Sequence, residues 1–164
     1  MNKREFLAAG AGLAISSLVP ETRGAVEDNI LTREQYQHYL DLFNANDPRF
    51  IEYYHPDVVL ELRDSEIRGD TGIREFYANV KQYIKEQVDC TLYVADEHTV
   101  AVEIPTRFEC IADWEDSFWG VPLKKGQVMR IITFGFYEVE NRKFKHIKAA
   151  RYKVLHDWRM ETPA

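Results

Sequence analysis

The chain has 164 residues, of which 45% are hydrophobic, and a formal net charge of −6 at pH 7. This length is enough for one domain with a substantial hydrophobic core. The excess of acidic residues and the lack of a basic stripe argue against nucleic-acid binding, which depends on clustered Lys and Arg.

Residues 1–25 have the layout of an export signal. Lys3 and Arg4 precede the apolar run LAAGAGLAISSLV, and a short polar stretch ends at Ala25. The run is too short to span a membrane, which takes about 20 residues. NKREFL resembles the twin-arginine export motif, with Lys3 in place of the first arginine. We expect removal of this signal and a periplasmic or secreted domain of residues 26–164; the alternative is a buried or disordered N-terminal segment.

Two helical segments are predicted at the start of the expected domain. Thr32 and Gln35 form a capping-box pattern that begins the first helix, and NANDP ends it. A short helical segment at about 48–54 stops before Pro56, because proline disrupts a helix, and DVVLEL then alternates as a strand. The apolar stripe of the first helix consists of Tyr36, Tyr39, Leu40 and Phe43.

A third helix is predicted from near Asp70 to near Glu86, after the turn RDSEIRGD. Leu and Ile would satisfy a plain core helix, yet two adjacent aromatic residues share the apolar stripe of this one. A buried tyrosine hydroxyl needs a hydrogen-bond partner, and the sequence of this helix does not show which group bonds to Tyr77. The stripe consists of Ile73, Phe76, Tyr77, Val80 and Ile84.

The rest of the chain predicts strands, at about 88–95, 99–111, 127–139 and 143–155. Helices followed by long antiparallel strands are typical of an α+β domain. Helices that cover one face of a curled sheet leave a cone with an internal cavity. We therefore expect this architecture, with the cavity as the place to search for a site.

The two cysteines are expected to be free and mostly buried. TLYVA and TVAVEI flank the turn DEH as a hairpin, and this register places Cys90 opposite Ile104 or Pro105. Cys110 then lies ~17 Å further along the strand, at ~3.3 Å per residue. A disulfide requires Cα atoms within ~7 Å.

Alternation along the strands selects the residues expected to face the cavity. On strand 99–111 these are Val102, Ile104, Thr106 and Phe108, and on strand 127–139 they are Val128, Arg130, Ile132, Phe134 and Phe136. The opposite face of strand 127–139 is apolar as well, which is typical of a strand covered on both sides. Because the helices cover one face only, we expect a homodimer that buries the other.

Residues 32–155 resemble the nuclear transport factor 2-like, or SnoaL-like, superfamily of cone-shaped α+β domains. QHYLDLFNAND is similar to the first helix of ketosteroid isomerase, and IREFYAN is similar to its third. GVPLKKGQV resembles the Gly-x-Pro-x-x-Gly hairpin common in SnoaL-like polyketide cyclases. The resemblance implies three N-terminal helices packed on a curved antiparallel sheet.

The resemblance also implies a catalytic group of tyrosines. Tyr39 stands where the isomerase keeps the tyrosine that donates to the developing enolate oxygen, and Tyr54 and Tyr77 stand where some isomerases have two further tyrosines bonded in a chain to it. Each bond in such a chain polarises the next and strengthens the terminal donor. The alternative is that three buried hydroxyls only satisfy one another.

Apolar residues stand at the positions of the acids that the family uses. Leu62 and Ile132 occupy the places of the two isomerase aspartates, and Ala149 that of the acid in SnoaL-like cyclases and limonene epoxide hydrolases. A shift of one residue would restore Glu61 or Asp64 at the first place, but alternation points Glu61 outward. The proton-transfer chemistry of the isomerase is therefore not implied.

Few polar side chains remain for the cavity. Arg130 and Arg151 favour a carboxylate or enolate ligand, unless each pairs with a surface acid. His55 is a candidate general base, or else a helix cap. No His pair or CxxC has metal-ligand spacing, so neither a metal nor a cofactor is expected. The expected ligand contacts are Arg130, Arg151, Phe76, Leu62, Ile104, Thr106, Phe108, Ile132, Phe134, Ala149 and Trp119 of the aromatic loop ADWEDSFWG.

Three functions fit these observations. The first is an exported enzyme without a cofactor, an isomerase, cyclase or dehydratase that acts on a small hydrophobic carbonyl compound. The second is a non-catalytic protein that binds a small hydrophobic ligand in the cavity. The third is a dimeric interaction module with a filled cavity. Fold resemblance cannot choose among them, because function depends on the site.

Overall fold

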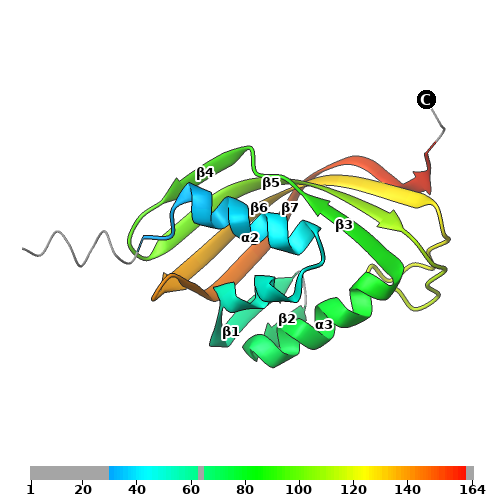
Figure 1. The fold of residues 1–164 in the computed structure, drawn as a ribbon. Helices are drawn as coiled ribbons and strands as arrows, with labels where there is room; N and C mark the ends of the chain where they lie inside the picture. The colour runs from blue at the N-terminus through cyan, green and yellow to red at the C-terminus, as the bar shows by residue number, and fades with distance from the viewer. Residues whose placement is uncertain (1–29, 63–64, 162–164) are drawn as a thin grey trace, which may run out of the picture.

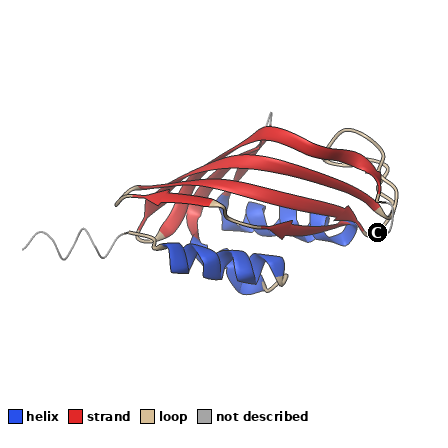
Figure 2. Cartoon of the chain, turned by 90° about the horizontal axis from the view of Figure 1, so that it is seen from above, coloured by secondary structure: helices blue, strands red, loops and turns tan. Residues whose placement is uncertain are grey.

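The computed structural model describes residues 30–62 and 65–161. The helices are α2 (Arg33–Asn44) and α3 (Gly69–Tyr83), and a short 3-10 helix η1 (Pro48–Tyr53) follows α2 (Figure 1). Figure 2 shows the helices on one side of a sheet that curves over them. This is the predicted cone-shaped α+β fold. The expected export signal, residues 1–25, lies outside the described residues.

The strands are β1 (Tyr54–Leu62), β2 (Ser65–Arg68), β3 (Ile84–Val88), β4 (Leu92–Ala95), β5 (Thr99–Cys110), β6 (Gln127–Glu140) and β7 (Lys143–Met160). In the described part of the chain they form one sheet in the order β2-β1-β7-β6-β5-β3, and β4 also pairs with β5. β1 and β7 run parallel, whereas the prediction was an antiparallel sheet. These two strands are far apart in sequence, so no hairpin turn imposes an antiparallel pairing on them.

The predicted start of α2 is confirmed in detail. The Thr32 hydroxyl accepts from the backbone N–H of Gln35 at 3.2 Å, and the Gln35 side chain accepts from the backbone N–H of Thr32 at 2.9 Å. β1 begins at Tyr54 and includes Pro56, which the prediction placed before the strand. Proline is tolerated there because the pairing of β1 with β7 is interrupted between Tyr54 and Val59.

α3 ends at Tyr83, three residues before the predicted end near Glu86. The next residues pair with β5, from Ile84 opposite Cys110 to Val88 opposite Thr106. Pairing with a distant strand thus overrides local helix propensity. The predicted turn before α3 also contains strand β2, which pairs with the end of β1.

The hairpin of β4 and β5 has the predicted register, with Leu92 opposite Glu103. Cys90 lies opposite Ile104, because its neighbours bond to the flanking residues of β5. Both cysteines are free and buried, and their thiols donate to the backbone carbonyls of Leu92 and Ala112. The prediction of two free thiols is confirmed.

The main core lies between α2, η1 and the concave face of the sheet. Phe144 of β7 is fully buried at its centre, and its ring lies 5.0 Å from that of Tyr39 and 4.8 Å from that of Tyr137. A second cluster around Trp114, Leu123 and Met129 fills the other end of the sheet. None of the described helices combines the length and hydropathy needed to cross a membrane.

Candidate functional site

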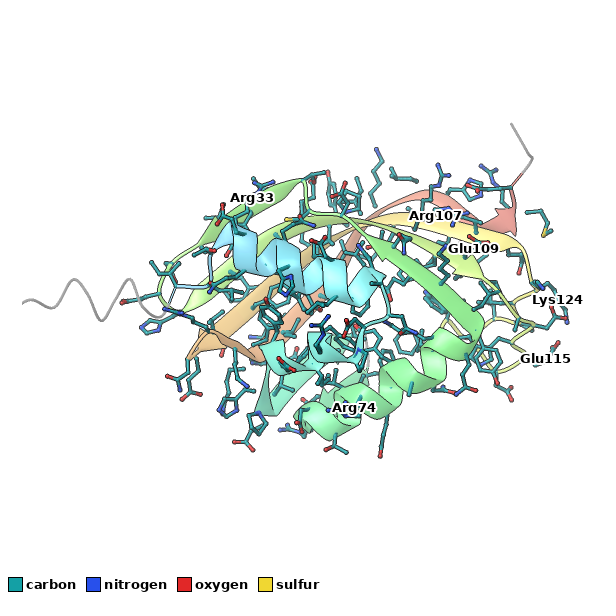
Figure 3. The ribbon with its side chains drawn as sticks, in the orientation of Figure 1. Arg33, Arg74, Arg107, Glu109, Glu115 and Lys124 are labelled. Carbon is teal, nitrogen blue, oxygen red and sulfur yellow. The ribbon has the colours of Figure 1, made fainter. Side chains whose placement is uncertain are left out.

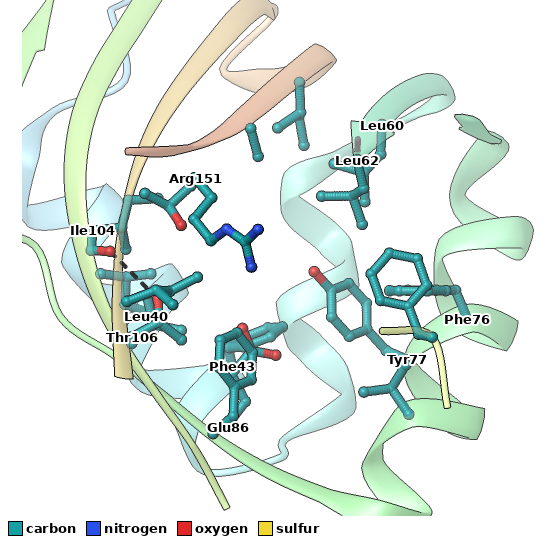
Figure 4. Close-up of a pocket in the computed structure, with 18 of the residues that line it drawn as sticks. Leu40, Phe43, Leu60, Leu62, Phe76, Tyr77, Glu86, Ile104, Thr106 and Arg151 are labelled. Carbon is teal, nitrogen blue, oxygen red and sulfur yellow. Dashed lines mark hydrogen bonds between the residues drawn. The ribbon is translucent and has the colours of Figure 1, made fainter. Parts of the chain in front are cut away.

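A cavity of about 180 Å³ lies between the concave face of the sheet and the helices (Figure 4). Its walls are mostly aromatic and aliphatic, with a few polar groups among them. Such a composition is typical of sites for small organic molecules. Among the residues predicted to line the cavity, the structure places there Tyr39, Tyr54, Tyr77, Leu62, Phe76, Ile104, Thr106, Phe108, Trp119, Ala149 and Arg151.

The predicted cavity face of β6 is wrong: none of Val128, Arg130, Ile132, Phe134 and Phe136 lines the cavity. Residues directly opposite each other in a sheet project from the same face. Ile104 and Thr106 face the cavity and pair with Thr133 and Ile131, so these two residues line it instead. The intervening residues project from the outer face of the sheet, the one away from the helices.

The contacts of the misplaced residues agree with this assignment. A guanidinium nitrogen of Arg130 lies 2.6 Å from a carboxylate oxygen of Glu161. The ring of Phe134 stacks on that of Tyr152, with 4.7 Å between ring centroids. Both faces of β6 are apolar in sequence, so alternation alone could not distinguish them; the register with β5 does.

The candidate general base His55 does not line the cavity. Its Nδ1 atom accepts from the backbone N–H of Asp57 at 3.1 Å and lies 3.1 Å from Nζ of Lys145. Glu140 is also near, with a carboxylate oxygen 3.8 Å from Nε2. His55 therefore belongs to a charged surface cluster, and its predicted swing into the cavity is not observed. Glu61, the possible replacement acid, bonds to His146 at 2.6 Å, and Asp64 lies outside the described residues.

The predicted tyrosine chain is confirmed for one link and wrong for the other. The hydroxyls of Tyr39 and Tyr54 are 2.7 Å apart. Tyr77 is not part of this chain in the part of the molecule that the structure describes. Its ring instead packs on Phe43 and Phe50, at 5.0 and 5.7 Å between centroids. Burial raises the pKa of all three tyrosines well above the ordinary value, so their hydroxyls stay neutral.

Tyr77 and Arg151 face each other across the cavity. Figure 4 shows the hydroxyl of Tyr77 and the guanidinium of Arg151 pointing toward the same space from α3 and β7. Arg151 lies opposite Thr133 of β6, and paired residues project from the same face, so both side chains line the cavity. This answers the question that the sequence raised: the Tyr77 hydroxyl is directed into the cavity.

Glu86 is an acid in the cavity that the sequence analysis missed. It lies on β3 opposite Phe108, and both side chains line the cavity. Burial among apolar groups raises the pKa of Glu86 to about 7. The signal that identifies it is the alternation of Ile84, Glu86 and Val88. The sequence prediction divides these residues between a helix that ends near Glu86 and a strand that begins at about residue 88.

Lys81 of α3 supplies a positive charge close to this acid. Its Nζ donates to the backbone carbonyl of Phe43 at 3.0 Å and lies 4.3 and 4.9 Å from the ring centres of Phe43 and Phe50. Burial lowers the pKa of Lys81, and its charge offsets part of the rise in the pKa of Glu86. Lys81 therefore tunes the acid without lining the cavity.

Replacement Lys81→Met should raise the pKa of Glu86 further, because the carboxylate loses a nearby cation that stabilises its charged form. An NMR titration of the Glu86 carboxyl carbon in both proteins measures the change. Lys85→Met is the matched control, since Lys85 is an exposed residue one position away on the same strand. A pKa that is unchanged or lower in Lys81→Met would contradict this account.

Among the described residues, no group of three or more His, Cys, Asp or Glu side chains is arranged to hold a metal ion. The charged pairs lie at the periphery instead. Figure 3 shows Lys124 and Glu115 in the loop after β5 and Arg107 and Glu109 on β5 itself. In each pair, a side-chain nitrogen of the basic residue lies 2.6 Å from a carboxylate oxygen of the acidic residue. The cavity thus differs from the surface in having few charged groups.

Comparison with known proteins identifies similar folds. Residues 36–147 match the family model described as SnoaL-like domain, and no curated protein matches the chain. A "putative polyketide cyclase" from Silicibacter sp. TM1040 is 19% identical, with a TM-score of 0.63 over 72% of this chain and 86% of that one. An LEH-like epoxide hydrolase from M. tuberculosis is 16% identical, with a TM-score of 0.58 over 80% and 85%. A "putative ketosteroid isomerase" from Kribbella flavida is 18% identical, with a TM-score of 0.55 over 85% and 84%.

Proposed function

The chain belongs to the SnoaL-like family, and from this premise we propose that its cavity binds a small, largely apolar carbonyl compound and that Glu86 transfers a proton on it. One observation carries the proposal: a carboxyl group stands in an apolar cavity with its pKa raised to about 7. A group with this pKa is about half ionised at neutral pH, so it can both accept and return a proton.

The chemistry follows from the groups around Glu86. Its carboxylate takes a proton from a carbon next to the carbonyl, and the electron pair of the broken C–H bond moves to the carbonyl oxygen. The resulting enolate is stabilised by the donors that point into the cavity, the Tyr77 hydroxyl and the Arg151 guanidinium. In a compound with a C=C bond next to the acidic carbon, return of the proton to the far carbon of that bond isomerises the compound. Its delivery to a departing β-hydroxyl group dehydrates the compound and releases water.

The similar structures support an enzymatic function. Their names describe a cyclase, an epoxide hydrolase and an isomerase. The present chain differs in where its acid stands, because Leu62 and Ala149 occupy cavity positions at which the family resemblance implies acids. Glu86 on β3 offers a replacement from another wall of the cavity.

The test is exchange of solvent deuterium into cyclohex-3-enone, followed by NMR, with the full chain as catalyst. We expect exchange above the buffer rate for the unmodified protein and its loss in Glu86→Gln. Glu75→Gln makes the same chemical change at an exposed position of α3 and should retain the activity. Equal exchange by the Glu86→Gln and unmodified proteins would refute the assignment of Glu86.

We further propose that the protein forms a homodimer through the outer face of the sheet. Phe134, Phe136 and Tyr152 on this face are 42%, 44% and 63% exposed, and the rings of Phe134 and Tyr152 stack on each other. An exposed apolar patch of this kind is typical of an interface. Charges of both signs, such as Arg130 and its partner Glu161, border the patch, which suits a two-fold pairing of identical surfaces.

Light scattering at micromolar concentration should give the mass of two chains, and Phe136→Glu should give the mass of one. A monomer in the unmodified protein would remove this proposal.

We also propose that residues 1–25 direct export. Mass spectrometry of the protein recovered from the periplasm or the medium should then show a chain that begins at residue 26, whereas recovery of the intact chain from the cytoplasm would contradict export.

A further inference from the structure

We infer that the ligand of this cavity is a monoanionic oxo acid with a single ring, held with its carboxylate at Arg151 and its carbonyl at a tyrosine hydroxyl. This inference rests on the proposed function of the cavity and specifies the class of compound. Three independent features carry it: the volume of the cavity, its unpaired hydrogen-bond donors, and the missing partner of Arg151.

The volume favours a ligand with one ring. The cavity measures about 180 Å³. An apolar cavity of about 150 Å³ holds benzene, and pockets for drug-sized molecules begin at about 300 Å³. A ring with a short substituent therefore fits inside, whereas most of a fused four-ring molecule would extend outside the cavity.

Several hydrogen-bond donors of the cavity have no acceptor among the described residues. Tyr39 and Tyr54 share one hydrogen bond, and neither hydroxyl has a second partner among the described residues. Two hydroxyls have two protons, so one of them stays free to donate. The hydroxyl of Tyr77 and the guanidinium of Arg151 add further donors. Glu86 is the acid that faces them, so the ligand has to supply the missing acceptor oxygens.

The charge of Arg151 specifies one of these acceptors. Arg107 and Arg130, which also lie on the sheet, have carboxylate oxygens of Glu109 and Glu161 at 2.6 Å. Arg151 has no such ion pair within residues 30–62 and 65–161. It is exposed as well as lining the cavity, so an entering ligand meets its guanidinium. The planar donors of an arginine match a carboxylate, which can accept two parallel hydrogen bonds.

The same arrangement accounts for the proposed proton transfer. With the carboxylate at Arg151 and the ketone oxygen at a tyrosine, the acidic carbon of an oxo acid lies in the space that Glu86 also lines. Glu86 takes the proton from this carbon, and the electron pair moves to the ketone oxygen. That oxygen takes a proton from water and Glu86 releases its own proton to water, which gives the enol form. The step needs no oxidant, reductant or second substrate.

Isothermal titration calorimetry on the full chain tests the inference with four probes. Phenylpyruvate and cyclohexylpyruvate are single-ring oxo acids, 1-phenylpropan-2-one lacks the carboxylate, and androst-5-ene-3,17-dione has four rings. We expect at least one acid to bind 10-fold or more tightly than the neutral ketone, and no binding of the steroid. Arg151→Met should lose this 10-fold preference but still bind the ketone, which shows that the variant is folded. Arg151→Lys should restore part of it.

Arg130→Met is the matched control, because Arg130 stands on the outer face of the neighbouring strand, and it should bind like the unmodified protein. The inference is overturned if neither acid binds, if the ketone or the steroid binds as tightly as the acids, or if Arg151→Met keeps the preference. Failure of the proposed function looks different: the acids would bind through Arg151, but exchange would not depend on Glu86. If exchange into cyclohex-3-enone depends on Glu86 while the acids do not bind, the function stands and the ligand class is wrong.

Discussion

Glu86→Gln should slow deuterium exchange into a bound carbonyl compound by at least about 100-fold, the lower end of what a positioned general base contributes. Glutamine keeps the size of the side chain but cannot accept a proton from carbon. Exchange by the unmodified protein should rise with pH up to about 7, because Glu86 must be ionised to act as the base and its pKa is about 7. A flat profile between pH 5 and 8 would contradict this role.

The same replacement should stabilise the protein at high pH. The pKa of Glu86 is about 7 in the folded state, compared with an ordinary value of 4.5 that applies to the unfolded chain. As pH rises from 4.5 to 7, the unfolded chain loses this proton first, so the folded state loses stability. A shift of this size corresponds to about 3 kcal/mol of unfolding free energy above pH 7, and to almost none at pH 4. Glutamine removes the penalty.

Urea denaturation of both proteins between pH 4 and pH 9 measures this difference. The unfolding free energies should be similar at pH 4 and should diverge up to about pH 7, with Glu86→Gln the more stable. All other ionisable groups are shared, so their effects cancel in the comparison. Glu75→Gln should follow the unmodified protein at every pH. A constant difference across the range would show that Glu86 does not hold its proton in the fold.

Phe144→Ala should destabilise the protein by about 3–5 kcal/mol, the usual cost of truncating a buried phenylalanine. Phe144 is fully buried. Its ring contacts Tyr39 and Tyr54 at 5.0 and 5.6 Å between centroids, and Tyr36 and Tyr137 at 6.2 and 4.8 Å. The hydroxyls of Tyr36 and Tyr137 are 3.0 Å apart, so they form a second hydrogen-bonded pair beside that of Tyr39 and Tyr54. The loss of the ring therefore removes the support behind both pairs as well as its own buried surface.

Thermal and urea unfolding measure the loss, with Phe144→Leu as the graded control. Leucine keeps much of the buried volume, so it should cost clearly less than alanine. The alanine variant should also bind ligand more weakly, because Tyr39 and Tyr54 are no longer held in place. A cost below about 1 kcal/mol for alanine would mean that the surrounding rings repack freely, and that this cluster does not position the cavity wall.

The contacts of the three tyrosines show how much of the site the family resemblance predicted. It correctly placed Tyr39, Tyr54 and Tyr77 in one cavity, and it correctly paired the first two. It placed Tyr77 in the same hydrogen-bonded chain, but the rings of Phe43 and Phe50 contact Tyr77 instead. Small differences in side-chain packing decide such a contact, because a hydrogen bond tolerates only a few tenths of an ångström.

The sequence by itself determined the elements whose signals are local. Three features depend only on residues close together in the sequence. They are the capping box of Thr32 and Gln35, the hairpin that joins β4 to β5, and the cavity face of β5. Strict alternation of buried and half-buried residues on β5 left only one possible orientation.

Only the tertiary structure decided the features that depend on distant pairing. β6 is apolar on both faces, so only its register with β5 determines that Ile131 and Thr133 line the cavity and that Arg130 lies on the outer face. The pairing of residues 84–88 with β5 ended α3 early and turned Glu86 inward. The site therefore depends on contacts between residues far apart in the chain, because the free energy of such pairing appears only when both strands are in place.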